Sequence, residues 1–159
     1  MKLNKILRNS LLVVLACLAL SACATKKVSK IGQMQGDVYT GTDTVEYLAK
    51  GVPDRVFFAT NESILTTRSR DTLRKQATWL RKNSDVNVVI EGHADERGTR
   101  EYNLALAERR ATAVRDYLVA LGLDQNRIKT ISYGKERPVD ARSVEDAWSK
   151  NRRSVTTVD

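Results

Sequence analysis

Apolar residues recur at helical spacing in two stretches of the chain. In the first, residues 66–83, the side chains of Leu73, Ala77 and Leu80 are separated by four and three positions. The second stretch continues for about five turns and has apolar residues at Leu104, Ala107, Ala111, Val114, Leu118 and Leu121. Such spacing keeps side chains on one helical face, so both stretches are predicted to be amphipathic helices. Gly122 fits the end of the second, because glycine commonly follows a helix.

Runs rich in β-branched and aromatic residues surround these helices and predict strands. They are residues 55–60 (RVFFAT), 86–92 (VNVVIEG), 129–135 (KTISYGK) and 153–158 (RSVTTV), with a further short helix expected within residues 145–153. The order is strand, helix, strand, helix, strand, then an irregular segment and a last strand. This order predicts an α+β fold, a two-layer β-α-β-α-β sandwich with both helices on one face of one sheet.

The first 22 residues follow the plan of a secretory signal peptide. Residues 1–10 carry three basic side chains and no acid, and residues 11–20 read LLVVLACLAL. That apolar run is too short to span a membrane, which takes roughly 20 residues. The next residues, LSAC, end at Cys23 and resemble the bacterial lipobox. The resemblance implies cleavage before Cys23 and lipid attached to it, and Ala24 after it fits retention in the outer membrane.

The domain boundaries follow from this leader. Residues 1–22 are expected to be removed, residues 23–46 to form the lipidated cysteine and a flexible tether, and residues 47–159 to form the folded domain. Removal of the leader lowers the formal charge from +8 to +5. It also removes Cys17, so no disulfide is possible once Cys23 is lipidated. Export and the mixture of acids among the bases both argue against nucleic acid as a partner.

The densest cluster of polar side chains lies in residues 91–111, EGHADERGTREYNLALAERRA. His93, Asp95 and Glu96 suggest a metal site, but they are too few for structural zinc, which takes about four ligands. They also suggest hydrolysis. The chain has no serine nucleophile elbow, and adjacent carboxylates do not straddle a glycosidic bond. We therefore expect no catalytic residues, no metal and no cofactor other than the lipid on Cys23.

A third reading of this segment is recognition of a zwitterion. The carboxylate of Asp95 could bind an ammonium group, and the guanidinium of Arg110 could bind a carboxylate in a bidentate way. The glycines at positions 92 and 98 would allow close approach of a ligand. Asn103, Leu106 and Arg110 share a helical face, expected to differ from the stripe that starts at Leu104. The alternative is that Asp95 and Arg110 only pair with each other.

Four segments carry a resemblance to a known family. They read GHADERGTREYN with LALAERRA after it, then ISYGKERP and WSKNRRSV. They resemble OmpA-like peptidoglycan-binding domains and, more narrowly, the peptidoglycan-associated lipoproteins of Gram-negative bacteria. The resemblance covers roughly residues 50–159. It implies the fold predicted above and a ligand, the meso-diaminopimelate of the peptidoglycan stem peptide, whose side chain ends in an ammonium and a carboxylate.

The resemblance also implies the residues of the site. Asp95 matches the aspartate of the family motif and Arg110 its helix arginine, while Arg109 is expected to face elsewhere. Supporting or lining positions fall on Arg97, Thr99, Asn103 and Leu106, and on the first strand at Phe58 and Asn61. One departure stands out there, because Thr60 and Asn61 replace the family's usual aromatic–aspartate pair.

The same resemblance implies partners and a location. Such a protein would be anchored in the outer membrane by its lipid, with its domain facing the periplasm. It would bind the cell wall and a TolB-like periplasmic protein in the Tol–Pal system, which serves envelope integrity and cell division. The alternative is a module that mainly binds the TolB-like protein and holds the wall weakly.

Overall fold

The computed structural model describes residues 37–43 and 45–159. The predicted signal peptide, Cys23 and the tether as far as residue 36 lie outside the described residues. Within the described part, no helix has both the length and the apolar character needed to cross a membrane.

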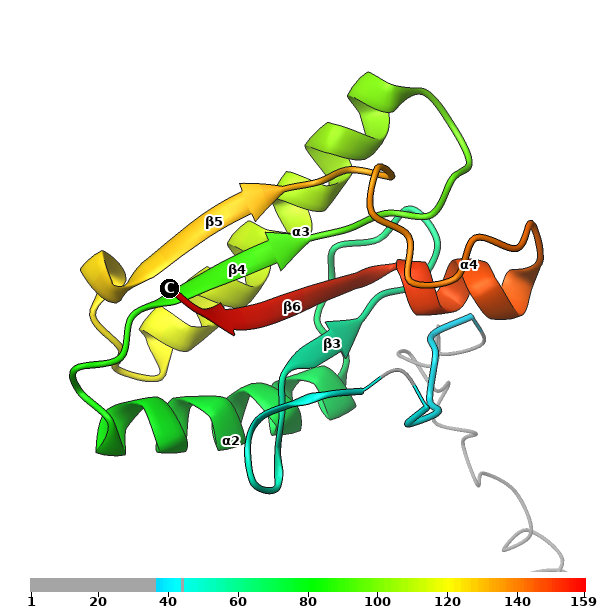
Figure 1. Cartoon of the computed structure of the whole chain (residues 1–159). Helices are drawn as coiled ribbons and strands as arrows, with labels where there is room; N and C mark the ends of the chain where they lie inside the picture. Colours follow the sequence, from blue (N-terminus) through cyan, green and yellow to red (C-terminus); the bar gives the residue numbers. More distant parts are fainter. Residues whose placement is uncertain (1–36, 44) are drawn as a thin grey trace, which may run out of the picture. The chain divides into compact units, whose positions relative to one another are not determined.

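A four-stranded mixed sheet forms one layer of the domain. Its strands are β3 (Arg55–Phe57), β4 (Val88–Gly92), β5 (Ile128–Ser132) and β6 (Arg153–Val158), in the order β3-β6-β4-β5. β4 and β5 are parallel, while β6 is antiparallel to both β3 and β4. The carboxyl ends of β3, β4 and β5 therefore meet the start of β6 at one edge of the sheet (Figure 1).

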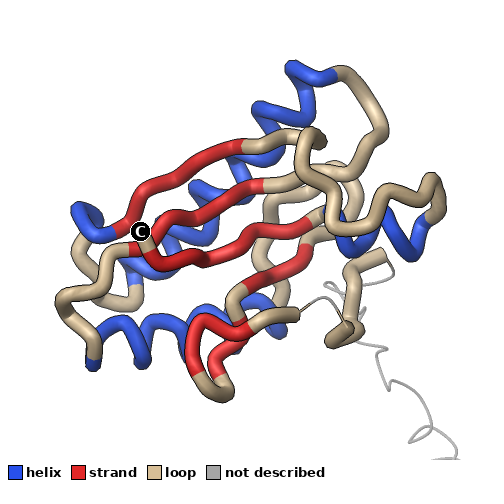
Figure 2. Tube along the Cα trace, in the orientation of Figure 1, coloured by secondary structure: helices blue, strands red, loops and turns tan. Residues whose placement is uncertain are grey.

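Two long helices form the other layer. α2 (Thr67–Lys82) and α3 (Arg100–Ala120) lie on the same face of the sheet (Figure 2), with the short α4 (Glu145–Asn151) beyond the sheet edge. Between them lies a core of side chains from helices and strands. It comprises Val56, Phe58, Leu73, Ala77, Leu80, Val88, Ile90, Ala111, Val114, Leu118, Leu123 and Ile128. The predicted α+β sandwich with both helices on one face is confirmed.

Two predicted strands end earlier than expected, because the strands that pair with them also end there. The run 55–60 is a strand only as far as Phe57, which pairs with Arg153, the first residue of β6. The run 129–135 ends at Ser132, which pairs with Gly92, the last residue of β4. A turn follows in which Gly134 has a φ of 54°. The sequence reading also missed a small hairpin of β1 (Tyr47–Ala49) and β2 (Val52–Pro53).

The buried face of α3 differs from the predicted stripe. Leu104 is 43% exposed and lies at the edge of that face. The buried residues are Asn103, Leu106, Ala107, Arg110, Ala111, Val114 and Leu118. The prediction of two separate faces was therefore wrong, because Asn103, Leu106 and Arg110 belong to the buried face and turn its centre away from Leu104.

Gly92 sets how closely α3 approaches the sheet. A Cβ at this position would lie 2.0 Å from the backbone oxygen of Ala107. No side chain can be accommodated at that distance, so only glycine lets the helix backbone pack directly on the end of β4. The close approach expected of a ligand at Gly92 is instead made by α3.

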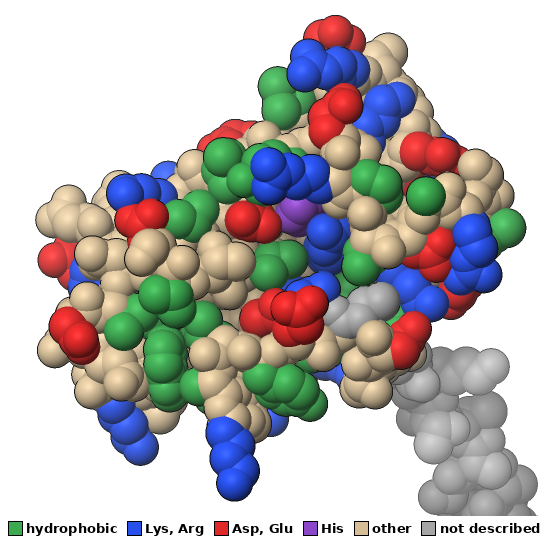
Figure 3. Space-filling model, viewed as in Figure 1, with side chains coloured by type: hydrophobic (Ala, Val, Ile, Leu, Met, Phe, Trp, Pro, Cys, Tyr) green, Lys and Arg blue, Asp and Glu red, His purple; other side chains and the backbone are tan. Residues whose placement is uncertain are grey.

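The face of the sheet that α2 and α3 leave open carries both charged and apolar side chains. Figure 3 shows Lys and Arg side chains interspersed with Asp and Glu on this side of the molecule, with apolar side chains between them. A mixed surface of this kind lacks the single-sign field that favours nucleic-acid binding.

Candidate functional site

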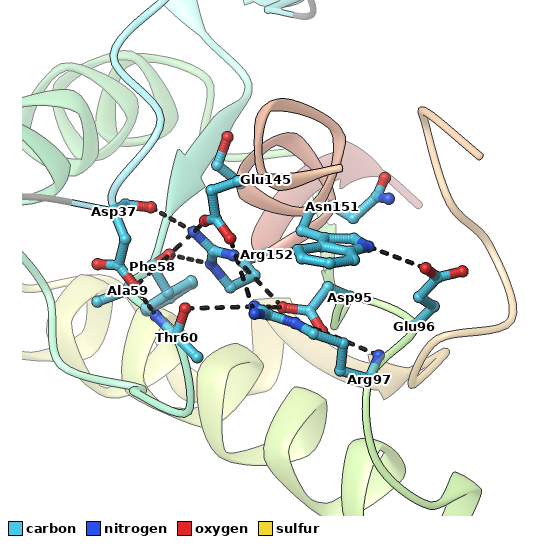
Figure 4. A network of polar contacts seen from close by, with 12 residues as sticks. Asp37, Phe58, Ala59, Thr60, Asp95, Glu96, Arg97, Glu145, Asn151 and Arg152 are labelled. Atoms are coloured by element: carbon cyan, nitrogen blue, oxygen red, sulfur yellow. Dashed lines mark hydrogen bonds and ion pairs between the residues drawn. The ribbon is translucent and has the colours of Figure 1, made fainter. Parts of the chain in front are cut away.

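A network of charged side chains joins the loops at the sheet edge where β3 and β4 end. It draws on four parts of the fold: the segment at Asp37, the loop after Phe57, the loop 93–99 between β4 and α3, and the junction of α4 with β6 at Arg152 (Figure 4). These parts are far apart in sequence, and the strand order of the sheet brings them together.

Asp95 is the buried anion of the network. Its Oδ1 accepts from Nε and the backbone N–H of Arg97, at 3.1 and 3.0 Å, and its Oδ2 accepts from Arg97 Nη2 at 2.7 Å. Arg152 Nη1 lies 3.4 Å from the same Oδ2. Burial alone would raise the pKa of Asp95, but the hydrogen bonds from Arg97 outweigh it and hold the pKa below its ordinary value. Asp95 is therefore a carboxylate at neutral pH.

Arg152 is the central residue of this network among those that were not predicted from the sequence, which also include Glu145, Trp148 and Asp37. It is fully buried. Its Nε donates to the carbonyl of Phe58 at 3.2 Å and its Nη2 to Glu145 Oε1 at 2.8 Å and to the carbonyl of Asp37. It follows α4 directly, within the segment WSKNRRSV that carries part of the family resemblance, so that segment was the available signal.

Arg110 lies in a separate, deeper position. Its Nε, Nη1 and Nη2 donate to the carbonyls of Glu62, His93 and Ala59, at 2.8, 2.9 and 3.0 Å. Burial and the nearby charge of Arg152 lower its pKa to about 10, so it remains a cation at neutral pH. The direct Asp95–Arg110 pair considered from sequence does not form, since Asp95 pairs with Arg97 and Arg152 while Arg110 ties two loops together through their backbone carbonyls.

The loop 93–99 is shaped by its own side chains. Asn103 is buried and its Nδ2 donates to the carbonyls of Arg97 and Thr99, at 2.8 and 3.1 Å. Gly98 has a φ of 89°, which favours glycine. Thr99 caps α3 by accepting a hydrogen bond from the backbone N–H of Tyr102 at 3.1 Å. The loop is therefore fixed at both ends, and Asp95 is held in one place.

The remaining predicted lining residues differ in what they can offer a ligand. The side chains of Phe58 and Leu106 are buried in the domain interior, 0% and 3% exposed. Asn61 is exposed and has a φ of 58°, a left-handed conformation that asparagine tolerates. Thr60 lies closest to the network, since its Oγ1 accepts from Arg97 Nη2 at 3.3 Å. Arg109 is exposed, as predicted.

Glu96 and Trp148 form the outer side of the site. Trp148 Nε1 donates to Glu96 Oε1 at 3.0 Å, and the guanidinium of Arg97 stacks 4.3 Å from the Trp148 ring centre. Arg97 Nη1 also lies 3.7 Å from Glu145 Oε2. The side chain of Arg97 is 38% exposed, so this cation lies between the buried Asp95 and solvent.

His93 takes no part in the network through its ring. Burial, with the charges of three nearby arginines, lowers its pKa to about 3. Among the described residues neither ring nitrogen has a hydrogen-bond partner. The backbone of His93 is hydrogen-bonded instead: its N–H donates to the Arg153 carbonyl, and its carbonyl accepts from Arg110 Nη1. The described residues also hold no group of three or more His, Cys, Asp or Glu arranged for a metal.

Comparison with known proteins identifies relatives over nearly the whole chain. The model of the OmpA family matches residues 57–152. A peptidoglycan-associated lipoprotein of Mesorhizobium japonicum is 46% identical over 155 residues, 95% of this chain and 92% of that one. The protein of the same name from Rhizobium meliloti is 44% identical over 99% of this chain and 92% of its own length.

Solved structures share the fold. The crystal structure of the peptidoglycan-associated lipoprotein from Burkholderia pseudomallei covers 67% of this chain and 90% of its own, with a TM-score of 0.65 and 35% identity. The C-terminal domain of Helicobacter pylori MotB covers 67% of this chain and 84% of its own, with a TM-score of 0.62 and 20% identity. At that identity the second likeness concerns the fold alone.

Proposed function

The chain belongs to the OmpA family and, within it, to the peptidoglycan-associated lipoproteins, and we propose that its domain binds peptidoglycan non-covalently from the outer membrane. As a member of this family it is a structural protein and not an enzyme. The observation that carries the proposal is Asp95, a buried carboxylate held by two arginines at the open edge of the sheet.

The ligand we propose is the diaminopimelate of the stem peptide. Its free end carries an ammonium and a carboxylate, so it needs a fixed anion and fixed donors. Asp95 supplies the anion. Arg110 has five N–H donors, of which three carbonyls take one each, so two remain. We infer that the ligand carboxylate is held by Arg110 together with Arg152 and the backbone N–H of Thr60, the residue after Ala59. Arg97, Thr99 and Asn103 hold the loop that presents Asp95.

Co-sedimentation of the protein with purified sacculi tests the proposal. Asp95→Asn keeps the shape of the side chain and removes its charge. Loss of a hydrogen bond to a charged group is worth roughly 1.5–3 kcal/mol, so binding should weaken roughly 10- to 100-fold. Asp116→Asn is the matched control, because Asp116 also pairs with an arginine but lies near the far end of α3.

The chemistry of the ligand is tested by competition. Free meso-diaminopimelate should release the protein from sacculi, whereas lysine, whose side chain ends in an ammonium without a carboxylate, should release it much less. Equal release by both, or sedimentation of Asp95→Asn that matches wild type, would show that Asp95 does not recognise a zwitterion.

The membrane end of the tether is proposed to be Cys23. Lipid on this residue would hold the domain at the inner surface of the outer membrane, facing the periplasm. Cys23→Ser should move the protein from the membrane fraction to the soluble fraction. Retention of the variant in the membrane would rule out Cys23 as the anchor.

A second candidate function is binding of a TolB-like periplasmic protein at the same edge of the sheet. Three exposed apolar side chains favour it: Ile64, Tyr102 and Val144, which are 68%, 44% and 46% exposed. They lie in the loop after β3, the first turn of α3 and the residue before α4. Calorimetry separates the candidates. Tight binding of the partner with undetectable heat from a diaminopimelate muropeptide would favour the second.

A further inference from the structure

The segment immediately before the hairpin, residues 37–43 and here called the strap, lies against the domain at the site. Asp37 Oδ2 accepts from the backbone N–H of Thr60 at 2.6 Å, and the Asp37 carbonyl accepts from Arg152 Nη2 (Figure 4). Further along, Asp43 pairs with Lys150 at 3.1 Å. Contacts with the domain therefore begin before residue 47, the predicted start of the fold.

The strap is also held by an aromatic contact. The ring of Tyr39 meets that of Phe57 edge-on, with centres 4.8 Å apart, and Lys150 Nζ lies 5.5 Å from the Tyr39 ring centre. These contacts place Asp37 at the site independently of its own charge.

Asp37 takes the place that an incoming carboxylate would need. Besides Thr60, its carboxylate faces Arg152, with Oδ2 3.8 Å from Nη2. Burial raises the pKa of Asp37, but the hydrogen bonds from Thr60 and the charge of Arg152 outweigh it and lower the pKa overall. The group is therefore an anion at neutral pH, and it occupies donors that would otherwise face the site.

Arg97 occupies the position of the ligand ammonium in the same way. It donates three hydrogen bonds to Asp95, the group proposed to bind a ligand ammonium. The side chains of Arg97 and Asp37 are 38% and 35% exposed, whereas those of their partners Asp95 and Arg152 are 9% and 1% exposed. The partners are fixed and the two occupants lie on the solvent side, so the occupants can leave without opening the core.

We propose that Asp37 is an internal competitor for the ligand carboxylate, so that the wall ligand binds by displacing the strap. The proposal rests on the function proposed above. Together, Asp37 and Arg97 present an anion and a cation at the two positions that a zwitterion would fill. The ligand would replace the Asp37 carboxylate and the Arg97 guanidinium with groups of the same charge. The other hydrogen bonds of the loops after β3 and β4 can therefore stay in place when the ligand binds.

Calorimetry on the full lipidated chain in detergent, with meso-diaminopimelate as the probe, tests this competition. Asp37→Ala removes the competing carboxylate, so affinity should rise about tenfold, which is the effect of about 1.4 kcal/mol. Asp43→Asn is the control, because Asp43 lies in the same strap but pairs with Lys150 and not with Thr60 or Arg152. Its affinity should equal that of wild type.

The outcomes separate this inference from the function on which it rests. If wild type binds the probe and Asp37→Ala binds it equally or more weakly, Asp37 is not a competitor, while wall binding stands. An equal gain in Asp43→Asn would overturn the assignment to Asp37. If wild type and Asp37→Ala both fail to bind, the proposed function fails and the competition with it.

Amide resonances of the same chain give a second readout. On saturation with the probe, the amide of Asp37 should move to the position of an unstructured residue, and that of Thr60 should shift as its acceptor changes. An Asp37 amide that stays at its unliganded position in the saturated complex would overturn the proposal, whatever the affinities.

Discussion

His93 should couple folding to pH in a range where other side chains seldom titrate. It is the single histidine of the chain and is 2% exposed. Burial and the positive charges of Arg153, Arg137 and Arg55 lower its pKa from 6.5 to about 3. Glu91 opposes them, with Oε2 3.5 Å from Nε2. Burial acts with three cations against one carboxylate, so the folded protein keeps the ring neutral.

The sign and size of the effect follow from the two pKa values. The unfolded chain regains a pKa near 6.5, so below that pH it binds a proton that the folded chain excludes. The free energy of unfolding therefore falls as the pH falls, by up to about 1.4 kcal/mol per pH unit. Between about pH 7.5 and about pH 5.5 the loss is about 1.4 kcal/mol, and it continues towards the folded pKa of about 3.

Urea unfolding of wild type and His93→Gln at about pH 7.5, 6.5 and 5.5 measures this loss. The range isolates the histidine, because ordinary carboxylates titrate below it. Wild type should lose stability across the range and the variant should lose little. A proton NMR titration of the folded protein is the independent check. A ring signal that titrates with a midpoint near 6.5, or a variant as pH-dependent as wild type, would refute the reasoning.

Three further substitutions test packing and the loops of the site. Gly92→Ala forces a Cβ to within 2.0 Å of Ala107 O, so the free energy of unfolding measured in urea should fall by about 3 kcal/mol or more. Arg152→Lys cannot reach all four acceptors of the planar guanidinium, so the melting temperature and sacculus binding should both fall, whereas the exposed Arg109→Lys should change neither. Asn103→Ala frees two carbonyls of loop 93–99, so amide hydrogen exchange in that loop should quicken while the helices stay protected.

The fold could be predicted because its signals are local. The spacing of Leu73, Ala77 and Leu80 fixes the buried face of α2, and all three are at most 1% exposed. Strand ends could not be predicted in the same way, because a strand ends where its neighbour does. Phe57 and Ser132 are the last residues of their strands through pairings with Arg153 and Gly92, which no local pattern encodes.

The part of the candidate site that lies on one loop and the helix after it could be proposed from the sequence. Asp95, Arg97, Thr99 and Asn103 are neighbours in sequence, and the structure brings them together. Arg152 is 57 residues from Asp95 and could be placed beside it only by the sheet order β3-β6-β4-β5. A charged residue between a helix and a strand gives no periodic signal of its own.

The two fully buried arginines explain how the loops of the site can stay fixed while the side chains that occupy it are replaced by a ligand. Arg110 and Arg152 bind backbone carbonyls from the loops after β3 and β4, at Phe58, Ala59 and His93 among others. A guanidinium reaches several carbonyls at once through its planar fork, which a lysine cannot do. The free-energy cost of burying these two cations is therefore offset when the chain folds, before any ligand binds. What remains for binding is exchange of the exposed occupants Arg97 and Asp37, so affinity should depend on those two side chains more than on any reshaping of the loops.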